Sequence, residues 1–177
     1  MKWFRNLKIA AKLILGFFML AVIAGVVGIV GLLSVFEVNN GSQTLYEVYT
    51  MGVAYAGEAS SDFQRLRYNA IKIATIDSES EIEYCIGNIE DLSVKIDELL
   101  DKYETVIVND EDRQLYEQAL QEWQEFMGYV NKAVEYSNKG QKEEVADIII
   151  NDCDAAGKEL RAIFDTMLDN NIMYAEA

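Results

Sequence analysis

The chain has 177 residues and a formal net charge of −15, and it contains neither histidine nor proline. The absence of histidine excludes histidine-based catalytic triads, histidine-ligated zinc and haem, and the Glu-x-x-His di-iron pattern of some helical bundles. The sequence also lacks a glycine-rich phosphate-binding loop and the other common catalytic motifs, so we expect no enzyme and no cofactor. The excess of acidic side chains argues against nucleic acid as a partner.

The N-terminal part of the chain predicts a membrane anchor. Leu13 to Phe36 are 24 consecutive residues without a charge, which as a helix would be roughly 36 Å long and would cross a hydrocarbon core of about 30 Å. Basic side chains precede this stretch, with no acidic one: Lys2, Arg5, Lys8 and Lys12. The positive-inside rule therefore predicts a cytoplasmic N-terminus over 1–12, a transmembrane helix over 13–36 and an extracytoplasmic domain over 37–177, anchored in the cell (inner) membrane.

A cleaved secretory signal is the competing interpretation of the same stretch. The apolar region of such a signal usually spans about 7–15 residues and ends at a small-x-small cleavage site. Here the apolar run is longer and continues through Leu32, Leu33, Val35 and Phe36. An uncleaved anchor is therefore favoured.

Beyond the anchor, the sequence predicts an all-α, antiparallel up-down-up-down four-helix bundle. Polar breaks separate four amphipathic segments, which we expect to form helices over 37–76, 79–107, 110–138 and 141–177. The first of these is predicted to continue the transmembrane helix, with residues 39–42 (Asn-Asn-Gly-Ser) as the place where it would loosen. The whole chain carries −15 and its first 36 residues carry +4, so the predicted bundle carries −19.

Apolar residues recur at steps of three and four in each segment, which predicts one buried seam per helix. In the first segment the seam is Leu45, Val48, Gly52, Tyr55, Ala59, Phe63, Leu66, Ala70 and Ile73. In the second it is Ile82, Cys85, Ile89, Leu92, Ile96, Leu99, Tyr103 and Val106. In the third it is Tyr116, Ala119, Trp123, Phe126, Val130 and Ala133. In the fourth it is Ala146, Ile149, Cys153, Ala156, Leu160, Ile163, Met167, Asn170 and Tyr174.

Several stretches, taken together and in order, resemble methyl-accepting chemotaxis receptors. They are the opening MKWFRNLKIAAKLILGFFMLAVIAGVVGIVG, LYEVY at 45–49, FQRLRYNAIKIA at 63–74 and NNIMYAEA at 170–177. The resemblance implies an N-terminal membrane helix followed by a four-helix-bundle sensor domain. It further implies a second membrane helix, a HAMP linker and a cytoplasmic methylated coiled coil that binds a histidine kinase, none of which this sequence contains.

The candidate ligand-binding residues lie on the first helix of the predicted bundle. In ligand-binding relatives of the family, basic residues on this helix contact small molecules, and here Arg65, Arg67 and Lys72 cluster beside Asn69. Arginine pairs bidentately with carboxylates, so a carboxylate such as an amino or organic acid fits this chemistry. Both a 62-66-69 and a 63-66-70 seam are workable here, and Arg67 flanks the second. The alternative is that these side chains are solvated and pair with nearby acids.

Two other groups of side chains are weaker candidates. Tyr84, Asn88, Phe126, Tyr129 and Asp152 would lie at a similar depth and line an upper pocket, although aromatic residues at helical spacing are more typical of a core. The acidic residues Glu143, Glu144, Asp147, Asp152 and Asp154 lack the spacing of a calcium-binding loop and are more typical of a solvated face.

The two cysteines are predicted to be free and buried. Counted at about 1.5 Å per residue from the turns predicted at 77 and 139, which lie at the end of the bundle far from the membrane, Cys85 lies roughly 12 Å along the second helix and Cys153 roughly 21 Å along the fourth. These two helices are diagonal partners in the predicted bundle. A disulfide needs Cα atoms within about 7 Å, so the two thiols are at the wrong levels for a bridge.

We therefore expect the sensor portion of a bacterial chemotaxis receptor, which transmits ligand occupancy through a small displacement of the fourth helix relative to the first. Aromatic side chains spread around the first helix predict a parallel homodimer: Tyr46, Tyr49, Tyr55, Phe63 and Tyr68. A ligand-loaded binding protein is an alternative partner, and contact with a cytoplasmic kinase complex is expected only through the missing C-terminal part. The input domain of a membrane histidine kinase or cyclase, and a ligand-free helical stalk, are the alternative functions.

Overall fold

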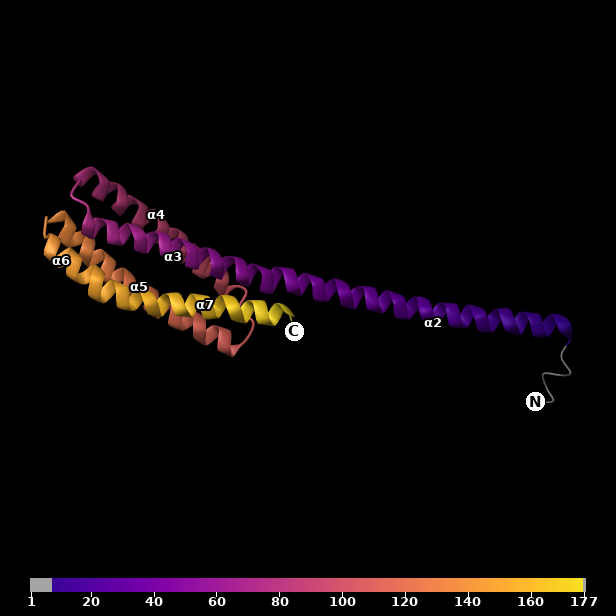
Figure 1. The fold of residues 1–177 in the computed structure, drawn as a ribbon. Helices are drawn as coiled ribbons and strands as arrows, with labels where there is room; N and C mark the ends of the chain where they lie inside the picture. The colour runs from indigo at the N-terminus through magenta and orange to yellow at the C-terminus, as the bar shows by residue number, and fades with distance from the viewer. Residues whose placement is uncertain (1–7, 177) are drawn as a thin grey trace. The chain divides into compact units, whose positions relative to one another are not determined.

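The computed structural model describes residues 8–176, without the side chains of Ile9, residues 37–47 and Glu176. The predicted basic residues Lys2 and Arg5, and the side chains of Leu45 and Tyr46, lie outside this description. The chain divides into two units, Met1–Thr44 and Leu45–Ala177. The first unit contains α2 (Ile9–Thr44), and the second contains the bundle helices (Figure 1).

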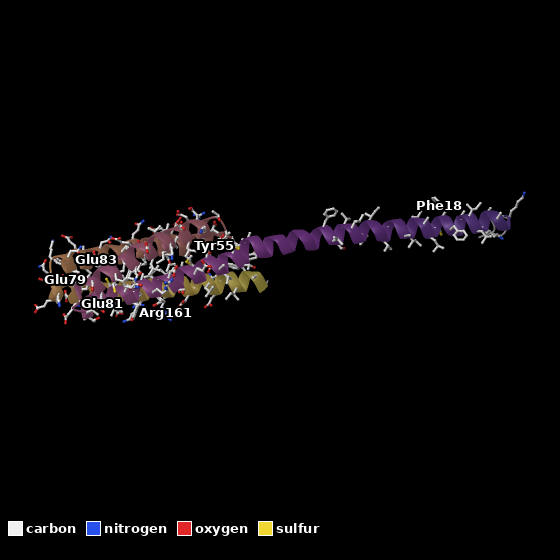
Figure 2. All side chains as sticks on the ribbon, turned by 90° about the horizontal axis from the view of Figure 1, so that it is seen from above. Phe18, Tyr55, Glu79, Glu81, Glu83 and Arg161 are labelled. Carbon is white, nitrogen blue, oxygen red and sulfur yellow. The ribbon has the colours of Figure 1, made fainter. Side chains whose placement is uncertain are left out.

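α2 is a helix with the composition of a membrane span. The segment Ala10–Phe36 has a mean hydropathy of 2.9, and its apolar side chains project outward around the whole helix (Figure 2). A helix that is apolar all round and exposed on every side is suited to lipid, where its backbone polar groups are satisfied internally. Among the described residues, this is the one helix long and apolar enough to cross a membrane.

The predicted loosening at residues 39–42 is wrong. The backbone stays α-helical to Thr44, and the irregularity follows as a π-helical turn, η1 (Leu45–Thr50), which leads directly into α3 (Met51–Thr75). A π turn accommodates a change of helical phase without giving up backbone hydrogen bonds, so no loop is needed. Residues 9–75 are therefore helical without interruption.

The bundle consists of α3, α4 (Glu79–Glu104), α5 (Asp110–Asn138) and a fourth helix made of α6 (Lys142–Asp147), η2 (Ile148–Cys153) and α7 (Asp154–Glu176). α3 packs along α4 and α7, and α5 packs along α6, η2 and α7. Because short connections join consecutive helices, neighbours in the chain run antiparallel. The predicted all-α four-helix bundle is confirmed.

The helix ends follow local chemistry. Asn109 caps α5, since its side chain accepts a hydrogen bond of 2.9 Å from the Asp112 backbone N–H. Gly140 follows α5 with φ of 71°, the left-handed conformation that favours glycine at a helix end. α4 ends at Glu104, three residues earlier than predicted, before a β-branched Val-Ile-Val run at 106–108 that disfavours helix.

The core confirms most of the predicted seam positions, with corrections on α3 and on the fourth helix. On α3 the 63-66-70 seam is the buried one, with Ala56 rather than Tyr55 in the core. On the fourth helix, Val145, Phe164 and Asn171 are buried in place of Ala146, Ile163 and Asn170. The buried positions of that helix step as four-four-three, which is close to 3.7 residues per turn, and the π turn of η2 lies within the first two steps. A strict heptad reading therefore drifts by one residue.

Candidate functional site

A cavity of about 290 Å³ lies between α3 and the fourth helix. Apolar side chains dominate its lining: Ala70, Ile71, Phe126, Ala146, Ile149 and Cys153. Two oppositely charged side chains, Arg67 from α3 and Asp154 from the start of α7, also line it. The cavity therefore combines an apolar surface with one cation and one anion, the pattern typical of sites for small ligands.

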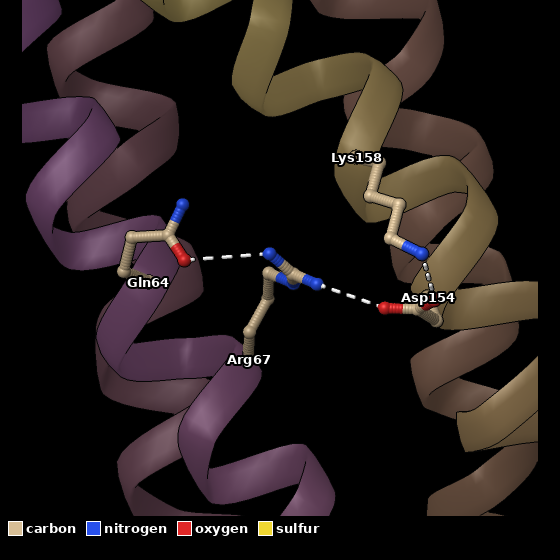
Figure 3. Close-up of polar contacts among 4 residues, drawn as sticks. All are labelled: Gln64, Arg67, Asp154 and Lys158. Carbon is tan, nitrogen blue, oxygen red and sulfur yellow. Dashed lines mark hydrogen bonds and ion pairs between the residues drawn. The ribbon is translucent and has the colours of Figure 1, made fainter.

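Arg67 is held at this cavity from three directions. Its Nη1 donates to Gln64 Oε1 at 3.4 Å, and its Nη2 donates to Asp154 Oδ1 at 3.2 Å (Figure 3). The guanidinium carbon also lies 5.9 Å from the centroid of the Phe63 ring, within the range of a cation–π contact. The Arg67 side chain is 17% exposed, so it is largely withdrawn from solvent.

Asp154 is shared between two cations. Lys158 contacts Asp154 Oδ2 at 2.6 Å from the next turn of α7, while Arg67 contacts Oδ1 (Figure 3). Lys158 is the main cause and Arg67 a further cause that hold the pKa of the Asp154 carboxyl below its ordinary value. Asp154 is therefore a carboxylate at neutral pH and keeps a cationic partner in Lys158 when Arg67 binds elsewhere.

Gly157 allows Arg67 to lie against α7. A Cβ atom at residue 157 would come within 2.8 Å of Arg67 Nε, a distance that real Cβ atoms do not adopt. Glycine costs about 1 kcal/mol relative to alanine inside a helix. Its presence in α7 is thus explained by the close approach of the arginine.

The opposite wall of the cavity is formed by the π turn. Ile149, Ile150 and Cys153 all belong to η2 and line the cavity. Burial raises the pKa of the Cys153 thiol to about 12, so the thiol stays neutral and acts as a small apolar surface. π turns inside α-helices occur frequently at functional sites.

The structure separates the four candidate residues on α3. Arg67 lines the cavity, whereas Arg65, Asn69 and Lys72 share a different face of the helix. Arg65 is exposed and pairs with Asp62 at 2.7 Å, and the Lys72 ammonium lies 5.9 Å from the Tyr68 ring centroid. Asn69 donates to the Arg65 carbonyl at 2.8 Å and accepts from Asn88 Nδ2 of α4 at 3.3 Å.

The suggested upper pocket is not formed by the residues named for it. Phe126 lines the cavity, but Tyr84 is 69% exposed and Asp152 is also exposed. Tyr129 donates to Glu125 on its own helix at 2.9 Å, and Asn88 bonds to Asn69. Sequence reasoning missed Asp154 and Gly157 as partners of Arg67. The sequence signal for this contact was Gly157, a glycine inside an otherwise regular helix.

Both cysteines are free and buried, as predicted. They lie on different elements, Cys85 in α4 and Cys153 at the end of η2. Among the described residues, no group of three or more acidic, cysteine or histidine side chains is arranged to hold a metal ion.

A four-helix bundle and a helix of membrane-spanning composition are the two structural features of this chain that bear on its class. Residues 6–177 match the family described as the four helix bundle sensory module for signal transduction. The chain belongs to this family of chemotaxis-receptor sensory modules, so the family indicated by the resemblance is confirmed.

One curated relative is a protein of Acetivibrio thermocellus named as a sensory transducer. The two are 27% identical over 111 residues, which cover 63% of this chain and 20% of the relative. The chain thus spans about a fifth of the length of that relative. The family and the relative agree that the chain is a sensory signal-transduction module.

Proposed function

We propose that the chain is the extracytoplasmic, non-enzymatic sensor of a bacterial chemotaxis receptor that detects a small carboxylate at the Arg67 cavity. Residues 13–36 would cross the inner membrane with 1–12 in the cytoplasm and 37–177 outside. The four basic residues before the span support this orientation. Labelling of Ser61→Cys by a membrane-impermeant maleimide in intact cells, but not of Lys8→Cys, tests the topology.

The Arg67–Asp154 pair at the apolar cavity carries the proposal. A ligand carboxylate would take the place of Asp154 at the guanidinium, where a bidentate pair is available. Asp154 would remain paired with Lys158, which lies 2.6 Å away, so its charge is not left uncompensated. An apolar body of the ligand would then contact Phe126 and Ile149, and an ammonium group, where the ligand has one, would face Asp154.

Ligand binding at this position would act on two helices at once. Arg67 belongs to α3, while Asp154 and the π turn belong to the fourth helix. A ligand that prefers one spacing of these helices shifts the population toward that spacing. We propose that this displacement is the signal, passed on by a parallel homodimer through further segments of a longer receptor to a cytoplasmic kinase complex.

A thermal-shift screen of the 177-residue chain in detergent micelles tests the ligand site. The panel pairs apolar amino acids with organic acids of the same carbon skeleton and with the matching amines. A true ligand at one hundred times its Kd stabilises by about 2.7 kcal/mol. Comparison of the amino acid with the organic acid of the same skeleton shows whether the ammonium group matters, and comparison with the amine shows whether the carboxylate does.

Arg67→Ala and Arg65→Ala form a matched pair of variants for the screen. We expect Arg67→Ala to abolish the shift and Arg65→Ala, on the other face of α3, to retain it. If both variants lose the ligand-induced rise in melting temperature, or if both keep it, the binding site lies elsewhere. A chain that no compound stabilises would favour a ligand-free stalk or recognition of a binding protein.

A further inference from the structure

A cluster of buried polar side chains joins the helices at the end of the bundle where α3 begins and α7 ends. Its members are Tyr103 of α4, Asp112 of α5 and Asn171 of α7, exposed by 1%, 0% and 0%. Among the described residues, Asp112 and Asn171 are the polar or charged side chains buried in the core. The cluster is separate from the Arg67 cavity and shares no residue with it.

The cluster is a chain of short hydrogen bonds. Asn171 Nδ2 donates to the Tyr103 hydroxyl at 2.6 Å and to the Met167 carbonyl at 2.9 Å. The Tyr103 hydroxyl in turn donates to Asp112 Oδ1 at 2.5 Å. Asp112 Oδ2 accepts from the Val108 backbone N–H at 3.2 Å, in the connection between α4 and α5. Three helices and a loop are thereby linked through one set of bonds.

The remaining helix of the bundle, α3, contributes a space rather than a bond. A Cβ atom at Gly52 would lie 2.2 Å from Asn171 Oδ1 and 2.8 Å from Asn171 Cγ, so the carboxamide fills the place of the missing side chain. Asn171 Oδ1 has no hydrogen-bond partner although it is buried. An apolar side chain of similar size would avoid the cost of burying this polar group. The asparagine therefore does not serve stability alone.

The sequence of the fourth helix offers two overlapping seams at this level. One passes through Ile163 and Asn170, and the other, which is buried, passes through Phe164 and Asn171. Apolar side chains tolerate repacking, so they discriminate weakly between two such faces. A buried hydrogen-bonding group finds its partners in one arrangement and loses them in the other, which is how a buried asparagine specifies register in coiled coils.

We infer that the Tyr103–Asp112–Asn171 cluster is the device that fixes the register and rotation of α7 against α3, α4 and α5. Turning α7 to the alternative seam, or sliding it by one turn of about 5.4 Å, separates Asn171 from the Tyr103 hydroxyl and from the space at Gly52. The inference concerns the packing of the bundle and does not depend on a ligand at Arg67.

Disulfide scanning of the 177-residue chain in detergent micelles tests the inference. Leu168 Cδ1 lies 3.9 Å from the position of a Cβ atom at Gly57, so Gly57→Cys with Leu168→Cys reports the observed register. Gly57→Cys is combined in turn with cysteines at 165, 167, 168, 169 and 172. The chain with Gly57→Cys alone measures background linkage to the buried native cysteines.

In the otherwise unchanged chain, we expect cross-linking at 168 to exceed the other positions by about tenfold. Asn171→Leu should spread cross-linking over neighbouring positions and reduce this ratio to about two, without lowering the melting temperature. Asn170→Leu, on the adjacent position, is the matched control and should keep the original ratio. Cross-linking that stays confined to 168 in Asn171→Leu overturns the inference. If Asn171→Leu does not fold, the same scan is made in Tyr103→Phe. Cross-linking that spreads beyond 168 in this variant supports the inference, and cross-linking confined to 168 overturns it.

Discussion

Polar side chains differ in burial and packing between the two ends of the bundle. At the Arg67 cavity Asp154 is 42% exposed, and open space of about 290 Å³ lies beside the charged pair. At the Asn171 cluster the polar side chains are fully buried, and a glycine makes room for the carboxamide. Charges beside open space can exchange partners at low cost, whereas groups packed without space cannot. The first arrangement suits a site of binding and the second suits a site of fixed geometry.

Removal of the Asp112 carboxylate should have the largest effect. Asp112→Ala leaves the Tyr103 hydroxyl and the Val108 N–H without their acceptor in a buried region, so we expect a loss of about 3 kcal/mol in the free energy of unfolding. Asp110→Ala, an exposed position in the first turn of the same helix, should lose less than about 1 kcal/mol. Urea titration followed by circular dichroism measures both. Equal losses would contradict the importance given to the cluster.

Two glycine substitutions, one at the Asn171 cluster and one at the Arg67 cavity, compare how the two ends of the bundle tolerate an added methyl group. Gly52→Ala forces a Cβ atom against a carboxamide that has no free space, and we expect a loss of about 2 kcal/mol. Gly157→Ala meets the flexible end of Arg67, which can move into the cavity. Relief of the helical cost of glycine then offsets the clash, and stability should stay within about 0.5 kcal/mol.

The two glycine variants should also respond differently to a ligand of the Arg67 cavity. Gly157→Ala should abolish stabilisation by any ligand of the Arg67 cavity, because the guanidinium is displaced, while Gly52→Ala should leave it intact. Gly87→Ala serves as the control, since nothing lies within 4 Å of its added Cβ atom. This exposed substitution should stabilise the chain by about 0.8 kcal/mol. A Gly157→Ala chain that still responds to ligand would show that Arg67 need not lie against α7.

Local pattern was sufficient to predict the helices and most of the core. The third seam, Tyr116 to Ala133, is buried as predicted, because α5 keeps a regular heptad throughout. The fourth seam was displaced at Phe164 and Asn171, because the buried positions of that helix repeat at about 3.7 residues per turn rather than at the 3.5 of a heptad. The site was predicted only as far as Arg67. Asp154 lies 87 residues away in the chain, and its pairing with Arg67 depends on helix registry that no local pattern contains.

Alkaline pH should lower the free energy of unfolding through the Tyr103 hydroxyl of the cluster. Burial, followed by the neighbouring Asp112, raises the pKa of the Tyr103 hydroxyl above its ordinary value of 10.0. Above pH 10 the unfolded chain releases this proton and the folded chain retains it, so stability contributed below pH 10 is lost as the pH rises. The slope approaches about 1.4 kcal/mol per pH unit for one group. Unfolding free energies measured from pH 9 to 11.5 should fall more steeply for the unsubstituted chain than for Tyr103→Phe. Parallel slopes would mean that Tyr103 ionises normally.

The smallest expected effect is a difference in the reactivity of the two cysteines. Cys85 is 0% exposed within the packed core, and Cys153 is 4% exposed but lines the open cavity. The raised pKa of about 12 keeps the Cys153 thiol protonated at pH 8, so alkylation of the folded chain should be slow at both positions. Access through the cavity should nevertheless make Cys153 react severalfold faster than Cys85, and a ligand bound beside Arg67 should remove that difference. Peptide mass spectrometry after timed iodoacetamide exposure gives both rates, with a denatured sample as the reference for full labelling. Equal alkylation rates without ligand would show that the cavity does not admit a small molecule. A disulfide between Cys85 and Cys153 in the untreated chain would show that the helix registry is wrong.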